Sequence, residues 1–263
     1  MALDSGSVSS LDTTKPNVAR IWDYWLGGKD NFASDREQAE LMLAINPLSA
    51  QMARENRQFL YRSVSHVAEQ GIRQFIDVGA GLPTAVNTHE IARRVAPEAK
   101  VAYLDHDMLV VRHAEALLAT SPGVIALWGE AADPEAILAD PALNKLIDFT
   151  EPVCVVLCGV LHFLDVTAAR ETVATFVRSV APGSYMIMSI GTGDPELGSD
   201  FAAAYKAANL RILSPEEFAS FFDGLEVMPP GVVPARGWTA CGQPLALGRR
   251  EATFLVGVGR KAA

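Results

Sequence analysis

The sequence contains few cysteines and no cluster of basic residues. Its three cysteines are odd in number and form no CxxC pair, so we expect reduced thiols rather than a disulfide framework. They are Cys154, Cys158 and Cys241. The 22 lysines and arginines are outnumbered by 31 acidic residues, which gives a net charge of -9, and no basic run is longer than a pair. A nucleic acid is therefore not an expected partner.

The sequence also lacks an apolar segment long enough to cross a membrane. Residues 1–15 are polar and rich in serine and threonine, without the apolar stretch of a signal peptide, and we interpret them as a disordered tail. The longest apolar run, 153–161, has about half the length that a spanning helix needs. This run predicts a buried strand. Without a spanning segment or a signal peptide, we expect a soluble, cytoplasmic protein with no membrane partner.

Three helices are predicted in the segment 16–71, which we interpret as a helical cap belonging to the same domain as the rest. Apolar side chains follow helical spacing from the N-cap residue Asn17 to a Gly-Gly pair. A second helix is predicted from Ser34, which has the capping-box spacing to Glu37, as far as an Asn-Pro breaker. A third is predicted over about 48–70, ending at a C-cap glycine.

From residue 72 to residue 263 short apolar runs alternate with helical segments, which is typical of a parallel sheet built from βαβ units. Strands are predicted at 74–78, 101–105, 123–127, 153–157, 184–190, 225–228 and 253–259. Helices are predicted at about 84–96, 107–119, 134–140, 167–181, 200–208 and 215–222. A long proline-containing connection separates the last two strands and favours an antiparallel pair there. These features predict an α/β, Rossmann-like class I methyltransferase fold, a seven-stranded and mostly parallel sheet with helices on both faces.

The segment FIDVGAGLPT, residues 75–84, carries the strongest local signal. Asp77 ends a strand, and Gly79 and Gly81 follow where backbone must approach a ligand closely. A dinucleotide-binding loop has a third glycine three positions later, but this sequence has Thr84 there. The loop therefore favours another nucleoside ligand, such as S-adenosylmethionine, over NAD. An ordinary tight turn capped by an aspartate remains the alternative.

Two more acids follow the next two predicted strands. Asp105 comes 24 residues after Gly81, where a carboxylate can accept hydrogen bonds from both ribose hydroxyls, while Asp107 is better placed as a helix N-cap. Glu130 lies beyond the third strand, where an acceptor could bind the adenine amino group, or it is a solvated loop acid. Because parallel strands end at one edge of a sheet, Asp77, Asp105 and Glu130 together predict a nucleoside site there.

Two further groups of residues allow more than one interpretation. His162 follows the fourth strand and is a candidate general base, but a lone histidine in an apolar stretch is more often a core or cofactor-packing group. Cys158 has no neighbour that predicts a reactive thiol. The aromatic side chains of the first helix, Trp22, Tyr24 and Trp25, form either a binding wall for a flat or cationic acceptor or part of the core.

Beyond these motifs the chain resembles the S-adenosyl methyltransferase family that was first catalogued as a domain of unknown function, also called methyltransferase type 19. The resemblance begins at PNVARIWDYWLGGKDNFASDRE, residues 16–37, and continues through ARENRQFLYR, FIDVGAGLPTAVNTHEIAR, VAYLDHDMLVVRHAEALL, GVLHFLD, FFDGLEV and FLVGVGRK. It implies a Rossmann-like methyltransferase with an N-terminal helical cap and S-adenosylmethionine as its cofactor.

The resemblance also implies a set of site residues. Asp77 and the glycine loop would lie at the methionine and ribose, Asp105 at the ribose and Glu130 near the adenine, with a lid formed by the loop 29–31 and by Asn56 with Arg57. The complete predicted cofactor set is Lys29, Asn31, Arg57, Asp77, Gly79, Ala80, Gly81, Pro83, Asp105, His106, Glu130, Ala131 and, through their backbone, Leu157 and Cys158.

Two segments depart from the family pattern. The usual Asp-x-Arg-Asp-Pro is Glu-Ala-Ala-Asp-Pro at 130–134, and a Trp-Arg-Pro-like segment is Trp-Thr-Ala at 238–240. Contacts to the cofactor and to the acceptor could therefore differ from those of relatives.

The sequence thus predicts a methyltransferase that acts on an oxygen, nitrogen or carbon atom of a small-molecule acceptor, mainly through proximity and desolvation and without a metal. One alternative is a regulatory protein that binds S-adenosylmethionine or S-adenosylhomocysteine without turnover. A third is an NAD(P)-dependent oxidoreductase, which Thr84 disfavours. Oligomeric state and acceptor identity are not predicted.

Overall fold

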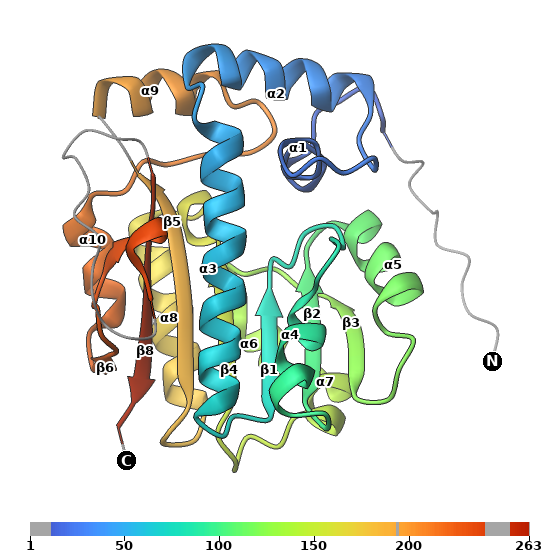
Figure 1. Cartoon of the computed structure of the whole chain (residues 1–263), viewed down its shortest axis with the longest axis vertical. Helices are drawn as coiled ribbons and strands as arrows, with labels where there is room; N and C mark the ends of the chain where they lie inside the picture. The colour runs from blue at the N-terminus through green and yellow to red at the C-terminus, as the bar shows by residue number, and fades with distance from the viewer. Residues whose placement is uncertain (1–11, 193–194, 240–252, 263) are drawn as a thin grey trace.

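The computed structural model describes residues 12–192, 195–239 and 253–262, and it contains one central sheet (Figure 1). The strands of the described chain run in the order β3-β2-β1-β4-β5-β8-β6, and the short β7 pairs with β8. Their bounds are β1 Gln74–Val78, β2 Lys100–Asp105, β3 Val124–Trp128, β4 Cys154–Cys158, β5 Tyr185–Thr192, β6 Leu225–Val227, β7 Val233–Pro234 and β8 Thr253–Lys261. The first five strands are parallel, whereas β8 is antiparallel to β5 and to β6. The predicted Rossmann-like class I fold is confirmed, including its antiparallel last pair.

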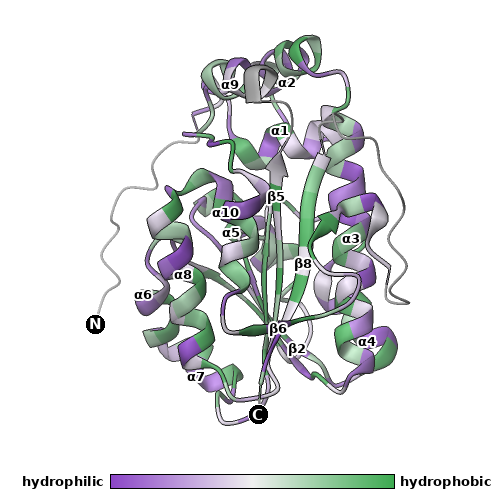
Figure 2. Ribbon diagram, turned by 90° about the vertical axis from the view of Figure 1, so that its left-hand side faces the viewer, coloured by the Kyte–Doolittle hydropathy of each residue, from purple (hydrophilic) through white to green (hydrophobic). Residues whose placement is uncertain are grey.

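Helices cover both faces of this sheet. The α-helices are α1 Val18–Trp25, α2 Ala33–Ile45, α3 Ser49–Glu69, α4 Thr88–Val95, α5 Met108–Leu117, α6 Pro134–Ala139, α7 Pro141–Leu146, α8 Val166–Ser179, α9 Pro195–Ala204 and α10 Pro215–Ala219. Short 3-10 helices lie at η1 Leu161–Phe163, η2 Ser220–Phe222 and η3 Ala235–Gly237. Seen edge-on, the sheet has α3 and α4 on one side and α6, α7 and α8 on the other (Figure 2).

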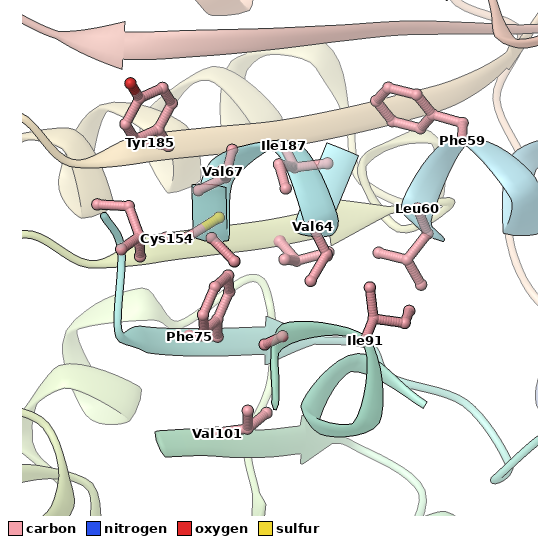
Figure 3. Close-up of a cluster of buried hydrophobic side chains, with 14 of the residues drawn as sticks. Phe59, Leu60, Val64, Val67, Phe75, Ile91, Val101, Cys154, Tyr185 and Ile187 are labelled. Carbon is pink, nitrogen blue, oxygen red and sulfur yellow. The ribbon is translucent and has the colours of Figure 1, made fainter. Parts of the chain in front are cut away.

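Alternation of apolar side chains along the strands builds a separate core on each face. Phe75, Val101 and Ile187 point to the face covered by α3, α4 and α5, where Phe59, Leu60, Val64 and Val67 of α3 pack on them (Figure 3). Their strand neighbours point to the opposite core under α8. Because the central parallel strands are covered on both faces, their sequences are mostly apolar, as in β4, although the run 153–161 predicted as a buried strand continues beyond β4 into a turn and the start of η1.

The structure corrects several predicted boundaries. The capping box predicted for Ser34 and Glu37 is wrong, because α2 begins at Ala33 and Asp35 accepts a hydrogen bond from the Phe32 N–H at 2.8 Å. Ser34 instead donates to the carbonyl of Thr13. The helix predicted at 84–96 begins only at Thr88, α9 begins earlier than predicted, and the short α7 was not predicted.

A cap made of α1, α2 and α9 lies over the carboxyl ends of the parallel strands, at the top of Figure 1. Ile21, Trp25, Ala39 and Met42 form its small apolar core with Tyr205. The long α3 runs from this cap down the face of the sheet, so the segment predicted as cap also supplies part of the main core. The Asn17 amide donates to the Asp107 carboxylate at 2.7 Å and ties the start of α1 to the end of β2.

Some predictions concern residues outside the described ranges. The tail predicted at 1–15 is described only from Asp12, and Cys241 also lies outside, as does Ala240 of the segment that departs from the family pattern. Trp238 of that segment is fully buried, with its ring 5.3 Å from the Phe59 ring centroid. In the described part of the chain, no helix combines the length and apolar character required to cross a membrane.

Candidate cofactor cleft and adjoining chamber

A cleft of about 300 Å³ lies at the carboxyl ends of β1, β2 and β4, beneath α1. Open α/β sheets bind their ligands at this place, where the crossovers leave a crevice between neighbouring strands. Of the predicted cofactor residues, the following line it: Arg57, Asp77, Gly79, Ala80, Gly81, Asp105, His106, Glu130, Ala131 and Cys158. The folded chain therefore brings together the acids and the glycine loop that lie far apart in the sequence.

The glycine loop turns tightly over the end of β2. The N–H groups of Gly79 and Ala80 both donate to the carbonyl of Leu104, at 2.8 and 3.1 Å, and the Gly81 N–H donates to the Asp105 carboxylate at 3.0 Å. Both glycines have φ of +68°, a conformation that residues with a Cβ adopt only at a cost. A Cβ on Gly79 would also lie 2.2 Å from a methyl carbon of Val160, whereas one on Gly81 would have no heavy atom within 4 Å.

Replacing Gly79 with alanine should damage the cleft more than replacing Gly81. Both variants take on backbone strain of about 1–2 kcal/mol, but only Gly79→Ala must also displace Val160. We expect Gly79→Ala to melt at a lower temperature than Gly81→Ala and to bind S-adenosylhomocysteine more weakly, with both properties partly restored by adding Val160→Ala. Equal behaviour of the two single variants in thermal melting and calorimetric titration would contradict this account.

Asp105 is a buried carboxylate whose two oxygens are held by backbone. One oxygen accepts from the Gly81 N–H and the other from the Asp107 N–H, each at 3.0 Å. A carboxylate has about four lone-pair sites, so further acceptor capacity remains for a ligand. The His106 ring lies 3.3 Å from the same carboxylate, and this hydrogen bond raises the pKa of His106. The predicted N-cap role of Asp107 is confirmed by its 2.8 Å bond from the Leu109 N–H.

Asp77 and Arg57 form the floor of the cleft near the end of β1. Burial raises the pKa of Asp77, which the hydrogen bond from the Thr88 hydroxyl and the Arg57 charge partly oppose. Arg57 donates to the Val86 carbonyl at 3.0 Å, yet its buried Nε has no hydrogen-bond partner within residues 12–192, 195–239 and 253–262. The buried Oδ1 of the neighbouring Asn56 has none either. Buried polar atoms without partners usually mark the place of a ligand or an ordered water.

Glu130, the residue predicted to bind the adenine amino group, lies at an open part of the cleft. Glu130 is exposed and lines the cleft, and Ala131 beside it is fixed by the Thr172 hydroxyl, which donates to the Ala131 carbonyl at 2.9 Å. On the opposite side, burial raises the pKa of the Cys158 thiol. A thiol held neutral in this way is a packing group rather than a nucleophile.

Four predicted cofactor residues do not line the cleft. The side chain of Leu157, a residue predicted to contribute backbone only, is fully buried in the core under α8, because side chains alternate along β4 and that of Cys158 points the other way. Lys29 is exposed, and Pro83 lies in the loop outside the lining. The Asn31 amide is engaged locally, because it donates to the Asp23 carboxylate at 2.8 Å and to the Gly28 carbonyl at 3.3 Å.

Two cleft residues of α1 lie outside the predicted cofactor set: Asp23, which the sequence does not single out, and Trp22, which is predicted only as an acceptor wall or a core residue. Trp22 and Asp23 line the cleft, and Asp23 is only 7% exposed although it carries a carboxylate. It accepts bonds from the Asp30 N–H and from the Asn31 amide, and thereby holds the loop after α1. An acid on an otherwise apolar helical face was the available signal. Among the described residues, no three His, Cys, Asp or Glu side chains lie close enough together to hold a metal ion.

A second cavity of about 80 Å³, which we call the aromatic chamber, lies between the cap and the ends of β5 and β8. Trp22 and Phe163 line both the cleft and the aromatic chamber, so the two cavities adjoin. Trp25 lines the aromatic chamber as well as belonging to the cap core, whereas the Tyr24 hydroxyl donates to the surface residue Glu40. The predicted aromatic helix thus contributes both to core packing and to a cavity wall.

His162 lines the aromatic chamber and is almost completely buried. Its Nδ1 accepts from the Gly191 N–H at 3.1 Å, so the neutral ring carries its proton on Nε2, for which no described residue is a partner. Burial lowers the pKa of His162 to about 3. At neutral pH the ring is therefore a hydrogen-bond donor to the chamber, which does not suit the general-base role proposed from the sequence.

The buried His162 should make the protein less stable in acid. The unfolded ring binds a proton near pH 6.5 and the folded ring only near pH 3, so acid favours the unfolded state throughout that interval. The stability that this contributes is present above pH 6.5 and is lost at up to about 1.4 kcal/mol per pH unit as pH falls. We expect urea unfolding of His162→Asn to depend less steeply on pH between 6.5 and 4. Identical slopes for variant and parent would contradict the burial of a neutral ring.

Comparison with known proteins agrees with this geometry. The sequence profile of a family described as S-adenosyl methyltransferase matches residues 4–262. The chain is 38% identical to a candidate methyltransferase of known structure from Thermobifida fusca YX, with a TM-score of 0.90 and coverage of 98% of this chain and 100% of the other. It is 36% identical to a DUF574 family protein from Streptomyces avermitilis MA-4680, with a TM-score of 0.87 and coverage of 95% and 99%.

A more distant similarity concerns the fold alone. The N-methyltransferase NodS from Bradyrhizobium japonicum WM9, solved in complex with S-adenosylhomocysteine, is 13% identical, with a TM-score of 0.50 and coverage of 93% of this chain and 100% of that protein. No sequence among curated proteins matches the chain significantly.

Proposed function

Because the chain belongs to the S-adenosyl methyltransferase family, we propose that it moves the methyl group of its cofactor, S-adenosylmethionine, to an oxygen, nitrogen or carbon atom of a small molecule. The observation that carries the proposal is the Asp105 carboxylate, which backbone N–H groups hold at the switch point of the sheet with acceptor capacity to spare. The family and the glycine loop disfavour the NAD(P)-dependent alternative.

The residues of the cleft fit this cofactor in charge and in hydrogen-bonding capacity. Asp105 would hold the ribose hydroxyls and Glu130 the adenine amino group. At the other end, the unpartnered Nε of Arg57 suits the carboxylate of the methionine part, and the unpartnered Oδ1 of Asn56 suits its ammonium group. The close approach of Gly79 to Val160 leaves no space for a side chain at the turn between them.

The cofactor supplies a methyl group that its sulfonium already activates, so the protein's part is to position the reactants and to exclude water. Trp22 and Asp23 of α1 roof the cleft together with the C-cap residue Leu26, and Phe163 lines both the cleft and the aromatic chamber. An acceptor oxygen or nitrogen would bond the methyl carbon with a lone pair while the carbon–sulfur bond breaks, and any proton on it would pass to water. With His162 neutral and donating, no described residue beside the aromatic chamber is proposed as a base.

The test combines binding with turnover. Calorimetric titration with S-adenosylhomocysteine should show micromolar binding, and incubation with methyl-labelled S-adenosylmethionine and a library of small molecules should transfer label to some of them. Binding without transfer to any acceptor class, macromolecules included, would favour a regulatory protein over an enzyme. Absence of binding would remove the proposal altogether.

A further inference from the structure

The aromatic chamber is built mainly from ring side chains that come from distant parts of the chain. Its aromatic wall consists of Trp22, Trp25, Phe163, Phe201, Tyr205 and Phe254. We propose that this chamber binds the methyl acceptor, and that the acceptor is a neutral molecule with a single aromatic ring and an oxygen substituent. The acceptor role rests on the proposed methyltransferase function, because it assumes that the adjoining cleft holds the cofactor.

The rings pack against one another and form an ordered wall. Phe163 and Phe201 each stack with Tyr205, with ring centroids 6.2 Å apart in both pairs. Trp22 meets Phe254 edge-on at 5.5 Å. Such contacts fix the orientation of each ring, and a flat apolar ligand can add a further ring to the arrangement at little conformational cost.

Two polar groups in this apolar wall have no hydrogen-bond acceptor among the described residues and indicate which group the ligand must carry. The Tyr205 hydroxyl is buried without a partner in that part of the chain, and its residue is only 5% exposed. The Nε2–H of His162 likewise has no acceptor among the described residues. Both groups can donate, and an unsatisfied buried donor costs about 1–3 kcal/mol. An oxygen on the ligand would satisfy either of them.

The charge of the wall favours a neutral ligand. The described lining side chains include no Asp, Glu, Lys or Arg, and His162 is uncharged at neutral pH because burial lowers its pKa to about 3. A charged group that entered the aromatic chamber would lose its hydration without gaining a counter-ion. An ammonium group could interact with the ring faces, but it could not accept from the two free donors.

The position and size of the chamber favour one ring with its reacting atom toward the cleft. Trp22 and Phe163 line both cavities and so form the boundary between them. The volume of about 80 Å³ is smaller than the roughly 150 Å³ that holds benzene in an engineered protein cavity. The chamber is therefore too small to enclose a whole ring, and a monocyclic acceptor must extend past Trp22 and Phe163 into the adjoining cleft.

Ligand-observed NMR titration with p-cresol, toluene and benzylamine tests the proposal, with S-adenosylhomocysteine absent and then present. We expect p-cresol to bind with a dissociation constant on the order of 1 mM, and toluene and benzylamine to bind several-fold more weakly. In the ternary complex we expect nuclear Overhauser contacts between p-cresol and the methylene groups beside the sulfur. Binding of toluene as tight as that of p-cresol, or a preference for benzylamine, would overturn the proposed acceptor class.

Two variants locate the binding site. Tyr205→Phe keeps the ring and removes only the hydroxyl, and should weaken p-cresol binding by about 3- to 10-fold without changing toluene binding. Gly191→Val should block the aromatic chamber, because a Cβ there meets only the Phe254 ring at 3.8 Å and the added methyl groups would enter the cavity. Unchanged p-cresol binding in both variants would place the ligand elsewhere and overturn the proposal.

The same titrations separate this inference from the proposed function. Failure of S-adenosylhomocysteine to bind would overturn the methyltransferase proposal and the acceptor role with it. Normal S-adenosylhomocysteine binding with no p-cresol binding would overturn this inference alone. Both variants should retain the parent affinity for S-adenosylhomocysteine, since neither residue lines the cofactor cleft.

Discussion

Replacing Asp105 with alanine is expected to weaken S-adenosylhomocysteine binding by about 100- to 1000-fold. The substitution removes the acceptor for the ribose hydroxyls, and hydrogen bonds to a charged group contribute about 1.5–3 kcal/mol each, so one strong bond or two weak ones account for the expected loss of about 3–4 kcal/mol. It also releases the Gly81 and Asp107 N–H groups that shape the loop around the ribose. Calorimetric titration measures the loss of affinity directly.

Asp165→Ala is the matched control for this experiment. Asp165 caps α8 through a 2.8 Å bond from the Ala168 N–H and does not line the cleft, so the variant should lose some thermal stability and no affinity. Asp105→Asn keeps the shape of the side chain and should fall between parent and Asp105→Ala. A folded Asp105→Ala protein that binds within threefold of the parent would show that the ribose is not held there.

The sequence predicts well those site residues that lie at or directly after the end of a strand. Asp77, Gly79, Gly81 and Asp105 are all placed by the rule that parallel strands end at one edge, and this rule needs no knowledge of how the helices pack. For Leu157 the resemblance predicts a backbone contribution only, and the alternation of side chains along β4 agrees with that restriction. Leu157 precedes the cleft residue Cys158 by one position, and that single step along β4 turns its side chain into the opposite core.

The roof of the cleft could not be predicted in the same way. Trp22 and Asp23 become cleft residues only because α1 docks over the strand ends, and that docking depends on contacts between segments far apart in the sequence, such as the bond from Asn17 to Asp107. The aromatic chamber also needs Phe201 and Tyr205, which come from and directly follow α9, more than 170 residues after α1. The spacing of residues along the sequence identifies these aromatic residues, but it does not predict that they contact one another in the folded chain.

The start of α2 illustrates the same limit at a single turn. Ser34 and Glu37 satisfy the capping-box pattern, yet Asp35 takes the capping role because its carboxylate is already held by another contact. That contact is a buried ion pair with Arg20, in which Nε lies 2.7 Å from the carboxylate and the two side chains are 3% and 0% exposed. Tertiary electrostatics therefore decided where the helix begins.

Breaking this ion pair should be the most damaging single change to the cap. Arg20→Met leaves the Asp35 carboxylate buried with hydrogen bonds from the Asn17 and Phe32 N–H groups but without its cation. An uncompensated buried charge of this kind costs about 3–5 kcal/mol. For a chain of this size we expect the melting temperature to fall by about 6–20 °C.

Two comparisons isolate the cause of that loss. Arg178→Met breaks the exposed pair with Glu171, whose side chains are 59% and 66% exposed, and should leave the melting temperature unchanged. The double variant Arg20→Met with Asp35→Asn removes both buried charges, while the amide oxygen can still accept from the backbone N–H groups, and it should recover part of the lost stability. If the double variant melts as low as Arg20→Met, the loss comes from packing rather than from the unpaired carboxylate.

The same variant also tests whether the cap belongs to the cofactor site. Arg20 lies on the helix that carries Trp22 and Asp23 over the cleft, so a loosened α1 should weaken S-adenosylhomocysteine binding even at temperatures where the sheet remains folded. Titration well below the melting transition, with near-ultraviolet circular dichroism to follow the packing of the tryptophans, separates this effect from global unfolding. Parent-like affinity in an Arg20→Met protein with altered tryptophan packing would mean that the cleft holds its ligand from the sheet side alone.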